Sequence, residues 1–391
     1  MRRIVALLVM LSALAATGSR AELLDFSTAE VARILRHGPW PPPFAADPSN
    51  RVSGQPEAAA LGRALFFETR LAPDGTFSCA SCHDPARAWS DGRPLSQGRV
   101  ALSRNAPGLL DVRSRRWFGW DGGHDNLWAM SLRPILDPRE FGGSAEGIAS
   151  RLRDDRALAA CYARAFKREP ADVDPQALAI DAAKALAAFQ ETLESRRSPF
   201  DDFRDALERG NVEAAARLPI AAQRGARLFV GRGQCAVCHL GPAFTNDEFH
   251  DIGIPFFTAD GVDPGRHAGI KALRESPLTL LGRWNDDPAR ASGNTTRHVD
   301  PQHRNFGEFR VPSLRNVALT APYMHNGSLA TLTDAVRHYS DLDAERLHGD
   351  GDAILKPLKL LPAEIDDVRA FLDSLTSHPA PEGAVEGPSC S

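Results

Sequence analysis

Two motifs with the same pattern constrain this chain more than any other feature. They are Cys79-Ala80-Ser81-Cys82-His83 and Cys235-Ala236-Val237-Cys238-His239, and each reads C-x-x-C-H, the attachment signature of a c-type haem. Two thiols three residues apart lie on one side of a helical turn, where they can add to the two vinyl groups of one porphyrin. The next residue then turns its imidazole onto the iron. The sequence therefore predicts two covalently attached c-type haems, with iron ligands His83 and His239 and attachment points Cys79, Cys82, Cys235 and Cys238.

Zinc is the competing interpretation of paired cysteines. Structural zinc takes four ligands at paired spacings, whereas here both cysteine pairs are followed directly by histidine. Haem is therefore favoured. Two further cysteines remain, Cys161 and Cys390. A disulfide between them is one interpretation, but we expect Cys161 to be a small buried apolar residue and Cys390 to belong to a loose tail.

The first 21 residues have the pattern of a signal peptide. Arg2 and Arg3 form a basic region, 4–16 is an apolar run, and Ser19 and Ala21 occupy the −3 and −1 positions of a cleavage site. The run is too short to span a bilayer, and no later stretch is long enough. We expect an exported, periplasmic protein that is cleaved after Ala21 and has no membrane span. The net charge of −4 does not indicate the excess of basic residues that is typical of a nucleic-acid-binding protein.

An internal repeat predicts the domain organisation. Gly62-Arg63-Ala64-Leu65-Phe66 precedes the first haem motif, and Gly225-Ala226-Arg227-Leu228-Phe229 precedes the second. The expected fold is mainly α, with two tandem cytochrome-c-like haem domains. The expected boundaries are 1–21 for the signal peptide, 22–210 for the N-terminal haem domain, 211–378 for the C-terminal haem domain, and 379–391 for a flexible tail.

Hydrophobic spacing places several helices. Helical periodicity is seen in 28–37, 180–195 and 363–375. Another helix is expected over 331–339, where Thr331 and Asp334 match a capping box. The stretch 246–308 is rich in Gly, Pro, Asp and Asn and predicts a long insertion with little regular structure.

With two C-x-x-C-H domains in this order, the chain resembles the bacterial di-haem cytochrome c peroxidases and their MauG-like relatives, from about Gly62 to Leu375. The likeness also rests on Arg104-Asn105-Ala106-Pro107, Trp120-Asp121-Gly122 and the run from Leu314 to Tyr323. The resemblance implies two mostly α haem domains that face each other. It also implies that the N-terminal haem reacts with peroxide and that the six-coordinate C-terminal haem passes electrons.

The resemblance also assigns roles to individual residues. Trp120 matches the tryptophan between the haems, which can relay an electron or a hole; a core tryptophan is the alternative. Glu140 matches the distal carboxylate that moves a proton during O–O cleavage, and Pro134 matches a proline that limits access to the iron. Asn105, with the backbone carbonyls of Thr320 and Pro322, matches a calcium site between the domains.

Three departures from the peroxidase pattern indicate the subclass. Tyr339 stands where the second haem of the peroxidases takes a methionine, and MauG-like enzymes carry tyrosine there; Met324 and His338 are the rival ligands. A phenolate favours higher oxidation states of iron, whereas a thioether favours Fe(II). Gln97 stands where many peroxidases carry a histidine that caps the first haem at rest, so we expect this haem to be open to peroxide. Met130 replaces a distal glutamine, which leaves the chemistry of that pocket open.

Together these features predict an enzyme that reacts with hydrogen peroxide and uses high-valent haem iron to oxidise a Trp or Tyr of an exported partner protein. Trp117 and Trp128 flank Trp120 and could extend a hole-transfer route; an aromatic core is the alternative. The stretches 40–43 and 117–128 are most similar to MbnH-type enzymes, which oxidise a tryptophan of a partner protein. The first alternative is a di-haem cytochrome c peroxidase that takes electrons from a small cytochrome c or a cupredoxin. The second is a non-enzymatic di-haem electron carrier.

Overall fold

A computed structural model of the chain describes residues 22–255, 257–258, 261–342, 354–377 and 390. The expected signal peptide, 1–21, lies outside the described residues, as does almost all of the expected tail. The described part is mostly helical, as expected. Its α-helices are α1 (Thr28–Leu35), α2 (Pro56–Phe66), α3 (Leu127–Leu136), α4 (Ala145–Asp154), α5 (Arg156–Phe166), α6 (Pro175–Gln190), α7 (Pro199–Glu208), α8 (Val212–Ala215), α9 (Ile220–Val230), α10 (Arg266–Glu275), α11 (Asn294–Arg297), α12 (Leu332–Ser340) and α13 (Pro362–Asp373). The strands are β1 (Phe249–His250), β2 (Phe257–Thr258), β3 (Gly261–Val262) and β4 (Phe309–Arg310).

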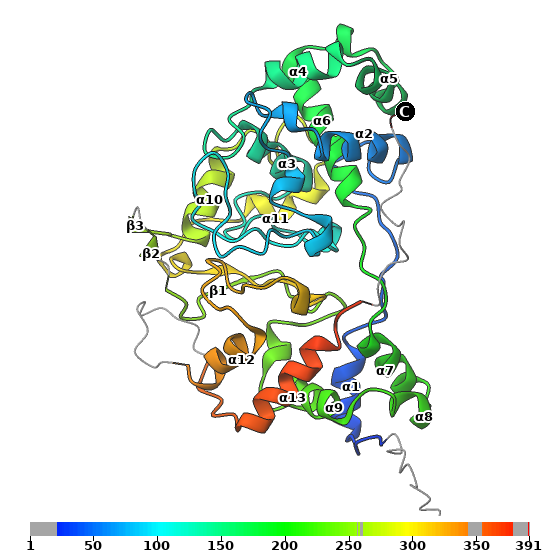
Figure 1. Cartoon of the computed structure of the whole chain (residues 1–391), viewed down its shortest axis with the longest axis vertical. Helices are drawn as coiled ribbons and strands as arrows, with labels where there is room; N and C mark the ends of the chain where they lie inside the picture. Colours follow the sequence, from blue (N-terminus) through cyan, green and yellow to red (C-terminus); the bar gives the residue numbers. More distant parts are fainter. Residues whose placement is uncertain (1–21, 256, 259–260, 343–353, 378–389, 391) are drawn as a thin grey trace, which may run out of the picture.

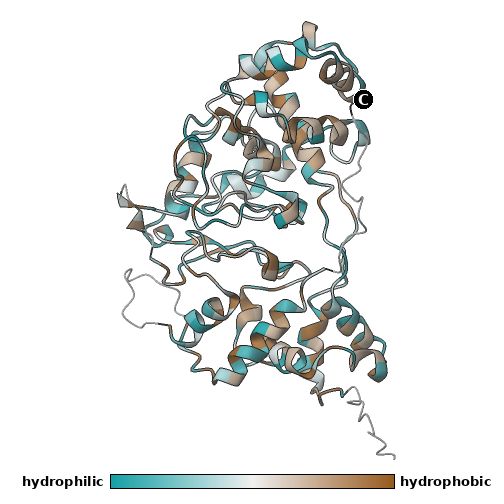
Figure 2. Cartoon of the chain, in the orientation of Figure 1, coloured by the Kyte–Doolittle hydropathy of each residue, from teal (hydrophilic) through white to brown (hydrophobic). Residues whose placement is uncertain are grey.

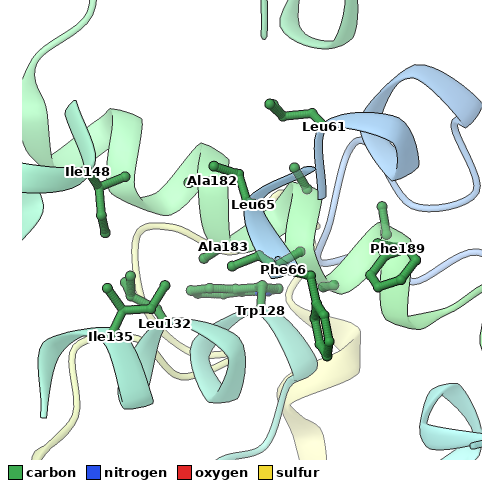
Figure 3. Close-up of a cluster of buried hydrophobic side chains, with 14 of the residues drawn as sticks. Leu61, Leu65, Phe66, Trp128, Leu132, Ile135, Ile148, Ala182, Ala183 and Phe189 are labelled. Carbon is green, nitrogen blue, oxygen red and sulfur yellow. The ribbon is translucent and has the colours of Figure 1, made fainter. Parts of the chain in front are cut away.

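The helices gather around two separate hydrophobic cores, which form the two lobes of Figure 1. The first core lies between α2, α3, α4, α5 and α6 (Figure 3). Trp128 of α3, Phe66 of α2 and Ala183 of α6 meet there and are almost completely buried. Along both lobes hydrophobic and hydrophilic positions alternate within each helix (Figure 2), as expected of helices that pack with one face on a core.

The second core is built from α1, α7, α9, α12 and α13. It contains Phe200, Phe229, Phe244 and Phe371, whose rings pack edge to face or tilted against one another. Helices α1 and α7 fall inside the range 22–210, yet they pack in this second core. The domain boundaries themselves stay a prediction.

The internal repeat has a structural counterpart in two tight helix crossings. Helix α2 crosses α6 at Gly62, where an added Cβ would come within 1.9 Å of the Ala185 carbonyl oxygen. Helix α9 crosses α13 at Gly225, where an added Cβ would come within 2.0 Å of the Asp367 carbonyl oxygen. At each crossing, the backbones of the two helices lie so close that a residue with any side chain could not replace the glycine. The repeated Gly-x-x-Leu-Phe pattern marks the same crossing ahead of each haem motif.

Local capping signals place most of the helix ends. Thr331 caps α12 in a capping box with Asp334, which confirms the prediction. Helices α1 and α13 also lie where expected. Helix α6 begins earlier than predicted, because Asp174 caps it and Pro175 occupies its first turn. Leu193, expected in this helix, follows its end but is still buried in the first core.

The stretch 246–308 is less irregular than predicted. It contains the ten-residue helix α10, and two short antiparallel ladders pair β1 with β4 and β2 with β3. The first ladder lies between the two lobes (Figure 1). The Arg310 amide of β4 donates to the Trp120 carbonyl at 2.8 Å, which ties this ladder to the tryptophan expected between the haems.

The expectation that Cys161 and Cys390 are unpaired is wrong. The structure joins them in a disulfide, with their Cα atoms 5.3 Å apart. Cys161 is buried in α5 of the first lobe, and the end of the chain reaches it there (Figure 1). The pairing could not be derived from the sequence because 229 positions separate the two residues.

The part of the chain that the structure describes holds no helix long and apolar enough to cross a membrane.

Candidate functional site

The two C-x-x-C-H motifs adopt the same local structure. Residues Cys79–Ser81 and Cys235–Val237 each form a single 3-10 turn. The amide of His83 donates to the Cys79 carbonyl at 3.0 Å, and that of His239 donates to the Cys235 carbonyl at 2.9 Å. Each turn therefore brings the histidine back beside its first cysteine. All four cysteines of the motifs carry free thiols, as attachment to a porphyrin requires.

Each histidine is oriented by one backbone carbonyl. Nδ1 of His83 lies 3.1 Å from the Trp89 carbonyl oxygen, and Nδ1 of His239 lies 3.0 Å from the Phe244 carbonyl oxygen. A carbonyl only accepts, so Nδ1 is the protonated nitrogen and Nε2 carries the lone pair. Burial lowers the pKa of both rings, that of His239 to about 4, so both are neutral. This orientation is typical of histidines that bind a metal through Nε2.

A largely apolar cavity of about 240 Å³ opens beside the second motif. Cys235, Cys238 and His239 line it, together with Tyr339 of α12. Burial, with a smaller contribution from the two cysteines, raises the pKa of Tyr339, so without a bound cation the phenol keeps its proton. The structure therefore brings Tyr339 to the haem motif from a position 100 residues further along the chain. Cys235, Cys238 and His239 could therefore hold a c-type haem in this cavity, and Tyr339 is a candidate second ligand to its iron.

The two rival ligands are placed differently. Met324 lines the same cavity, on a residue with a positive φ of 74°. His338 instead turns Nε2 to the Ile252 carbonyl oxygen at 2.8 Å. The tyrosine and the methionine thus stay as alternatives at this haem, and ligation by Tyr339 stays a prediction.

Glu140, the expected acid–base residue, lies in the turn that follows α3. Its Oε1 accepts from Arg133 at 2.6 Å, and Arg133 also pairs with Asp137 at 3.0 Å. The Glu140 side chain is only 13% exposed. Arg133, which lies on the last turn of α3 next to Pro134, is a partner of Glu140 that the sequence did not predict.

The region around Glu140 belongs to the first haem motif. Burial raises the pKa of Cys79 to about 12 and that of Cys82 to about 11, and the charge of Glu140 contributes to both shifts. The Gln97 carbonyl oxygen lies 3.8 Å from the Cys82 Sγ. The side-chain amide of Gln97 donates to the Gly98 carbonyl, so the Gln97 side chain folds back onto the backbone of the next residue. Met130, expected in the distal pocket, packs partly buried against the first core.

Trp120 lies where the two halves of the site meet. It lines the cavity of the second haem motif and also a neighbouring cavity of about 100 Å³. Its indole nitrogen donates to the Asn105 carbonyl at 2.9 Å. The smaller cavity contains no residue of the first haem motif, so these contacts place Trp120 beside the second motif only. Its relay role itself stays a prediction.

The residues expected to bind calcium lie together. Asn105, Thr320 and Pro322 all line the smaller cavity beside Trp120. The side-chain Nδ2 of Asn105 donates to the Arg93 carbonyl at 2.7 Å, so the side-chain Oδ1 is the atom that could face a cation. An amide oxygen and two backbone carbonyls are the hard oxygen donors that calcium prefers. Arg115, Arg310 and Arg315 line the same cavity and no carboxylate of the described residues does, so a calcium ion bound here stays a prediction.

Comparison with known proteins agrees with this arrangement. A family model described as di-haem cytochrome c peroxidase matches residues 56–209. The methylamine utilization protein MauG of Methylorubrum extorquens is 34% identical over 327 residues, which cover 83% of this chain and 80% of the relative. The cytochrome-c peroxidase IdrP2 of a Pseudomonas species is 32% identical, covering 88% of this chain and 86% of the relative. Among solved structures, a MauG-like protein associated with microbial copper homeostasis is 28% identical with a TM-score of 0.66, covering 90% of this chain and 99% of that chain.

Proposed function

Because the chain belongs to the di-haem cytochrome c peroxidase family, which includes MauG, we propose that it is a peroxide-dependent oxidoreductase that oxidises a Trp or Tyr side chain of a partner protein. The observation that carries this proposal is Tyr339, which lines one cavity with Cys235, Cys238 and His239. A hard anionic donor favours the higher oxidation states of iron. We place the enzyme and its partner in the periplasm, on the signal-peptide pattern.

When bound, the two c-type haems supply the reduction of peroxide and hold the oxidising equivalents until they are spent. The residues of the chain hold and orient them. Cys79 and Cys82 anchor the first, and Cys235 and Cys238 anchor the second. His83 and His239 present Nε2, because their Nδ1 atoms are engaged by backbone carbonyls.

Glu140 moves the proton that O–O cleavage requires. A carboxylate in this role takes a proton from the bound peroxide and returns it to the leaving oxygen. The Arg133 guanidinium, 2.6 Å away, holds the carboxylate near the first motif. Pro134, on the same turn of α3, restricts the space next to it. Gln97 is turned onto the Gly98 carbonyl and leaves the first haem open at rest.

Trp120 would relay oxidising equivalents between the two haems. It belongs to the first half of the chain, borders the cavity of the second motif, and donates its indole N–H to the Asn105 carbonyl. Calcium bound by Asn105, Thr320 and Pro322 would stabilise the contact between the two halves of the chain next to Trp120. The ion would supply charge and rigidity at the interface, and its donors come from both halves of the chain.

A second candidate function is a cytochrome c peroxidase that detoxifies hydrogen peroxide with electrons from a small redox protein. Met324 favours it, because this thioether lines the same cavity as Tyr339. With Met324 as ligand the second haem would have a high potential and would accept electrons from a donor.

One experiment separates the two functions. The purified, fully oxidised holoprotein is titrated with one equivalent of hydrogen peroxide, without reductant, and followed by absorption and EPR. We expect fast conversion of both haems to a long-lived oxidised state. A protein that reacts only after one haem has been reduced would contradict the proposal and support the peroxidase.

A further inference from the structure

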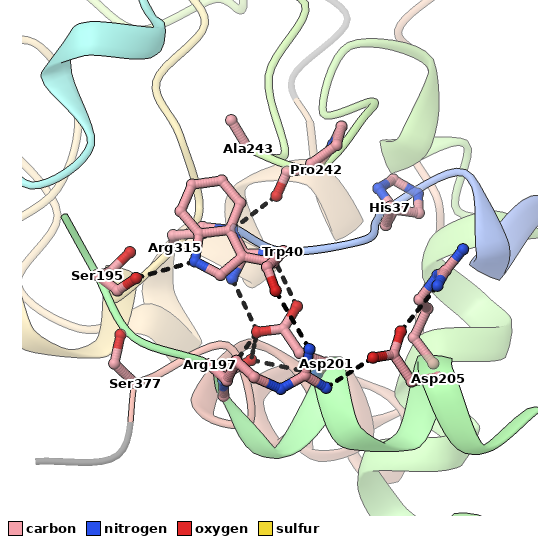
Figure 4. A network of polar contacts seen from close by, with 12 residues as sticks. His37, Trp40, Ser195, Arg197, Asp201, Asp205, Pro242, Ala243, Arg315 and Ser377 are labelled. Carbon is pink, nitrogen blue, oxygen red and sulfur yellow. Dashed lines mark hydrogen bonds and ion pairs between the residues drawn. The ribbon is translucent and has the colours of Figure 1, made fainter. Parts of the chain in front are cut away.

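The tryptophans of this chain fall into two groups according to what lies over their rings. The chain has six tryptophans. Four have the charged end of an arginine or lysine near the ring centroid: Arg315 at 3.6 Å from Trp40 (Figure 4), Arg266 at 4.4 Å from Trp117, Arg283 at 4.7 Å from Trp284, and Lys184 at 5.4 Å from Trp128.

The other two tryptophans are those next to the haem motifs. The Trp89 carbonyl accepts from His83, and Trp120 lines the cavity of the second motif. Over the described ranges of the chain, neither ring has an arginine or lysine lying on it. The cations therefore cover the four tryptophans that neither accept a hydrogen bond from a motif histidine nor line the cavity of the second motif, and they leave the other two uncovered.

A cation over an indole opposes its oxidation. Loss of one electron turns the ring into a radical cation, which a positive charge a few ångströms away repels, most strongly where both are buried. The attraction between the cation and the electron-rich face of the ring is also lost. A covered tryptophan is therefore a poorer acceptor of a hole than an uncovered one in a similar environment.

We propose that Arg266 and Lys184 are electrostatic guards that keep oxidising equivalents from leaking into Trp117 and Trp128, so that the hole stays on the haems and Trp120. The inference rests on the proposed function, because it concerns the oxidising equivalents that peroxide delivers. It also replaces the expectation that Trp117 and Trp128 extend the hole-transfer route.

Trp117 shows the clearest guard. It is three residues from Trp120 and only 2% exposed, and Arg266 is 4% exposed. Arg266 donates to the carbonyl oxygens of Asp121 (3.2 Å) and Gly122 (2.8 Å). No carboxylate among the described residues forms an ion pair with it within 4.0 Å, although the more distant charges of Asp121, Glu248 and Glu308 act on it. Burial lowers the pKa of Arg266 to about 10, and the side chain stays charged at neutral pH.

Trp128 has a second, independent guard. The ring is completely buried in the first core, and the Lys184 side chain is 1% exposed. The Lys184 ammonium is held by the Trp284 carbonyl at 2.8 Å and by Asp286 at 2.5 Å. Asp286 also pairs with Arg51 at 3.3 Å, so its negative charge is shared between two cations. Arg51 also pairs with Asp181, so the Lys184 ammonium lies over the ring as part of a network of paired charges.

The test compares charge removal with charge retention at each site. Arg266→Gln and Lys184→Gln remove the charge and keep a hydrogen-bond donor, whereas Arg266→Lys and Lys184→Arg keep the charge. Each fully oxidised holoprotein receives one equivalent of peroxide without partner or reductant, and hydroxylated tryptophans are located by peptide mass spectrometry. The reaction balances as tryptophan plus hydrogen peroxide giving hydroxytryptophan plus water.

We expect hydroxylation of Trp117 to rise at least about tenfold in Arg266→Gln, and that of Trp128 in Lys184→Gln, with the oxidised haem state decaying faster. The charge-retaining variants should match the wild type. Arg116→Gln is a milder variant that should act in the same direction, because Arg116 lies 5.9 Å from the Trp117 ring and is largely exposed. Equal hydroxylation in the Gln variant and its charge-retaining partner would overturn the inference.

Failure of the inference and failure of the proposed function give different results. If the wild-type haems react with peroxide and the peptide maps of all variants are the same, the guards are rejected and the proposed function stands. If the haems do not react, the proposed function fails. The guards are then tested with a photogenerated ruthenium(III) polypyridyl complex, which removes electrons from the holoprotein without peroxide. If the peptide maps of the variants and the wild type are the same in that experiment, the proposal that Arg266 and Lys184 are guards is rejected as well.

Discussion

At the scale of single residues, the expected acid–base residue Glu140 and the expected iron ligand Tyr339 differ in how far water reaches them. Glu140 is tied to Arg133 at 2.6 Å, and the partners are 13% and 42% exposed, so water still reaches the pair. Tyr339 lies in an apolar cavity where its proton is held tightly. Glu140 therefore keeps contact with water, whereas the buried Tyr339 gives up its proton only when a metal binds.

Replacing Glu140 should slow the reaction with peroxide. Glu140→Gln keeps the shape but cannot take up a proton, so we expect the second-order rate of peroxide reaction to fall by about 10²–10⁴. Stopped-flow absorption measures the rate, and the resting haem spectra should be unchanged. Glu146→Gln, an exposed position in the first turn of α4, is the control and should react like the wild type. A normal rate in Glu140→Gln would remove Glu140 from its role.

Replacing Tyr339 should change the second haem. In Tyr339→Met a thioether takes the place of a phenolate, so the midpoint potential should rise by a sizeable part of the roughly 0.8 V that axial ligands span. Spectroelectrochemistry measures the potential. The control is Tyr323→Phe, which lines the same cavity but donates its hydroxyl to the Val317 carbonyl at 3.1 Å. If Met324→Leu moves the potential and Tyr339→Met does not, Met324 is the ligand.

At the scale of elements, one helix crossing is used twice. Each haem motif follows a helix whose glycine packs directly on the backbone of a later helix, α2 on α6 and α9 on α13. Helix α2 ends at Phe66, ahead of the turn at Cys79, and α9 ends at Val230, ahead of the turn at Cys235. Packing of these helices is therefore coupled to the placement of both haems.

Adding a methyl group at one crossing should destabilise the protein. In Gly225→Ala the new Cβ would lie 2.0 Å from a backbone oxygen, so the helices must separate. We expect the free energy of unfolding to fall by about 1–3 kcal/mol. Urea unfolding of the holoprotein measures it. Gly147→Ala in α4 is the control, because its Cβ would meet only the Ser144 Oγ at 3.5 Å. Equal stability of the Gly225 variant and the wild type would show that the crossing is not tight.

At the scale of the whole molecule, the two lobes are joined by more than their shared chain. The disulfide between Cys161 and Cys390 fastens the end of the chain to α5 in the first lobe, although α13 packs in the second core. Arg104 of the first half also pairs with Asp263 of the second at 2.7 Å and with Asp121 at 2.6 Å. Asp263 lies just before α10, which packs against the first lobe, so this ion pair holds α10 in place there. Beside Trp120, the two halves of the chain are joined by backbone hydrogen bonds from Arg310 to the Trp120 carbonyl and from Asn105 to the His325 carbonyl, both at 2.8 Å.

Removing the disulfide should lower the stability of the whole protein. Cys161→Ser opens a closed loop of more than 200 residues, so we expect a loss of about 2–5 kcal/mol in the free energy of unfolding. Thermal and urea unfolding measure it, with the haem spectra as a check on the fold. Cys390→Ser should cause the same loss, and the double variant no more than either single variant. Additive losses would mean that the two cysteines act separately.

The sequence alone predicted the features that depend on neighbours along the chain. The haem motifs follow from their spacing, because both thiols and the histidine must reach one porphyrin from one turn. The capping box of α12 follows from Thr331 and Asp334, which lie within one helical turn. The family was also identified from short runs of residues, and the comparisons confirm it.

Only the tertiary structure decided which distant residues meet. It paired Cys161 with Cys390, brought Tyr339 into the cavity of the second motif, and placed Arg266 over Trp117. Such contacts join segments that are tens to hundreds of residues apart, and their positions depend on how the helices cross and how the loops of 246–308 pack. The local helix and turn preferences of the residues carry no information on contacts between such distant segments. The spacing of the motifs therefore specifies which cofactors the chain binds, whereas the tertiary fold specifies which side chains surround them.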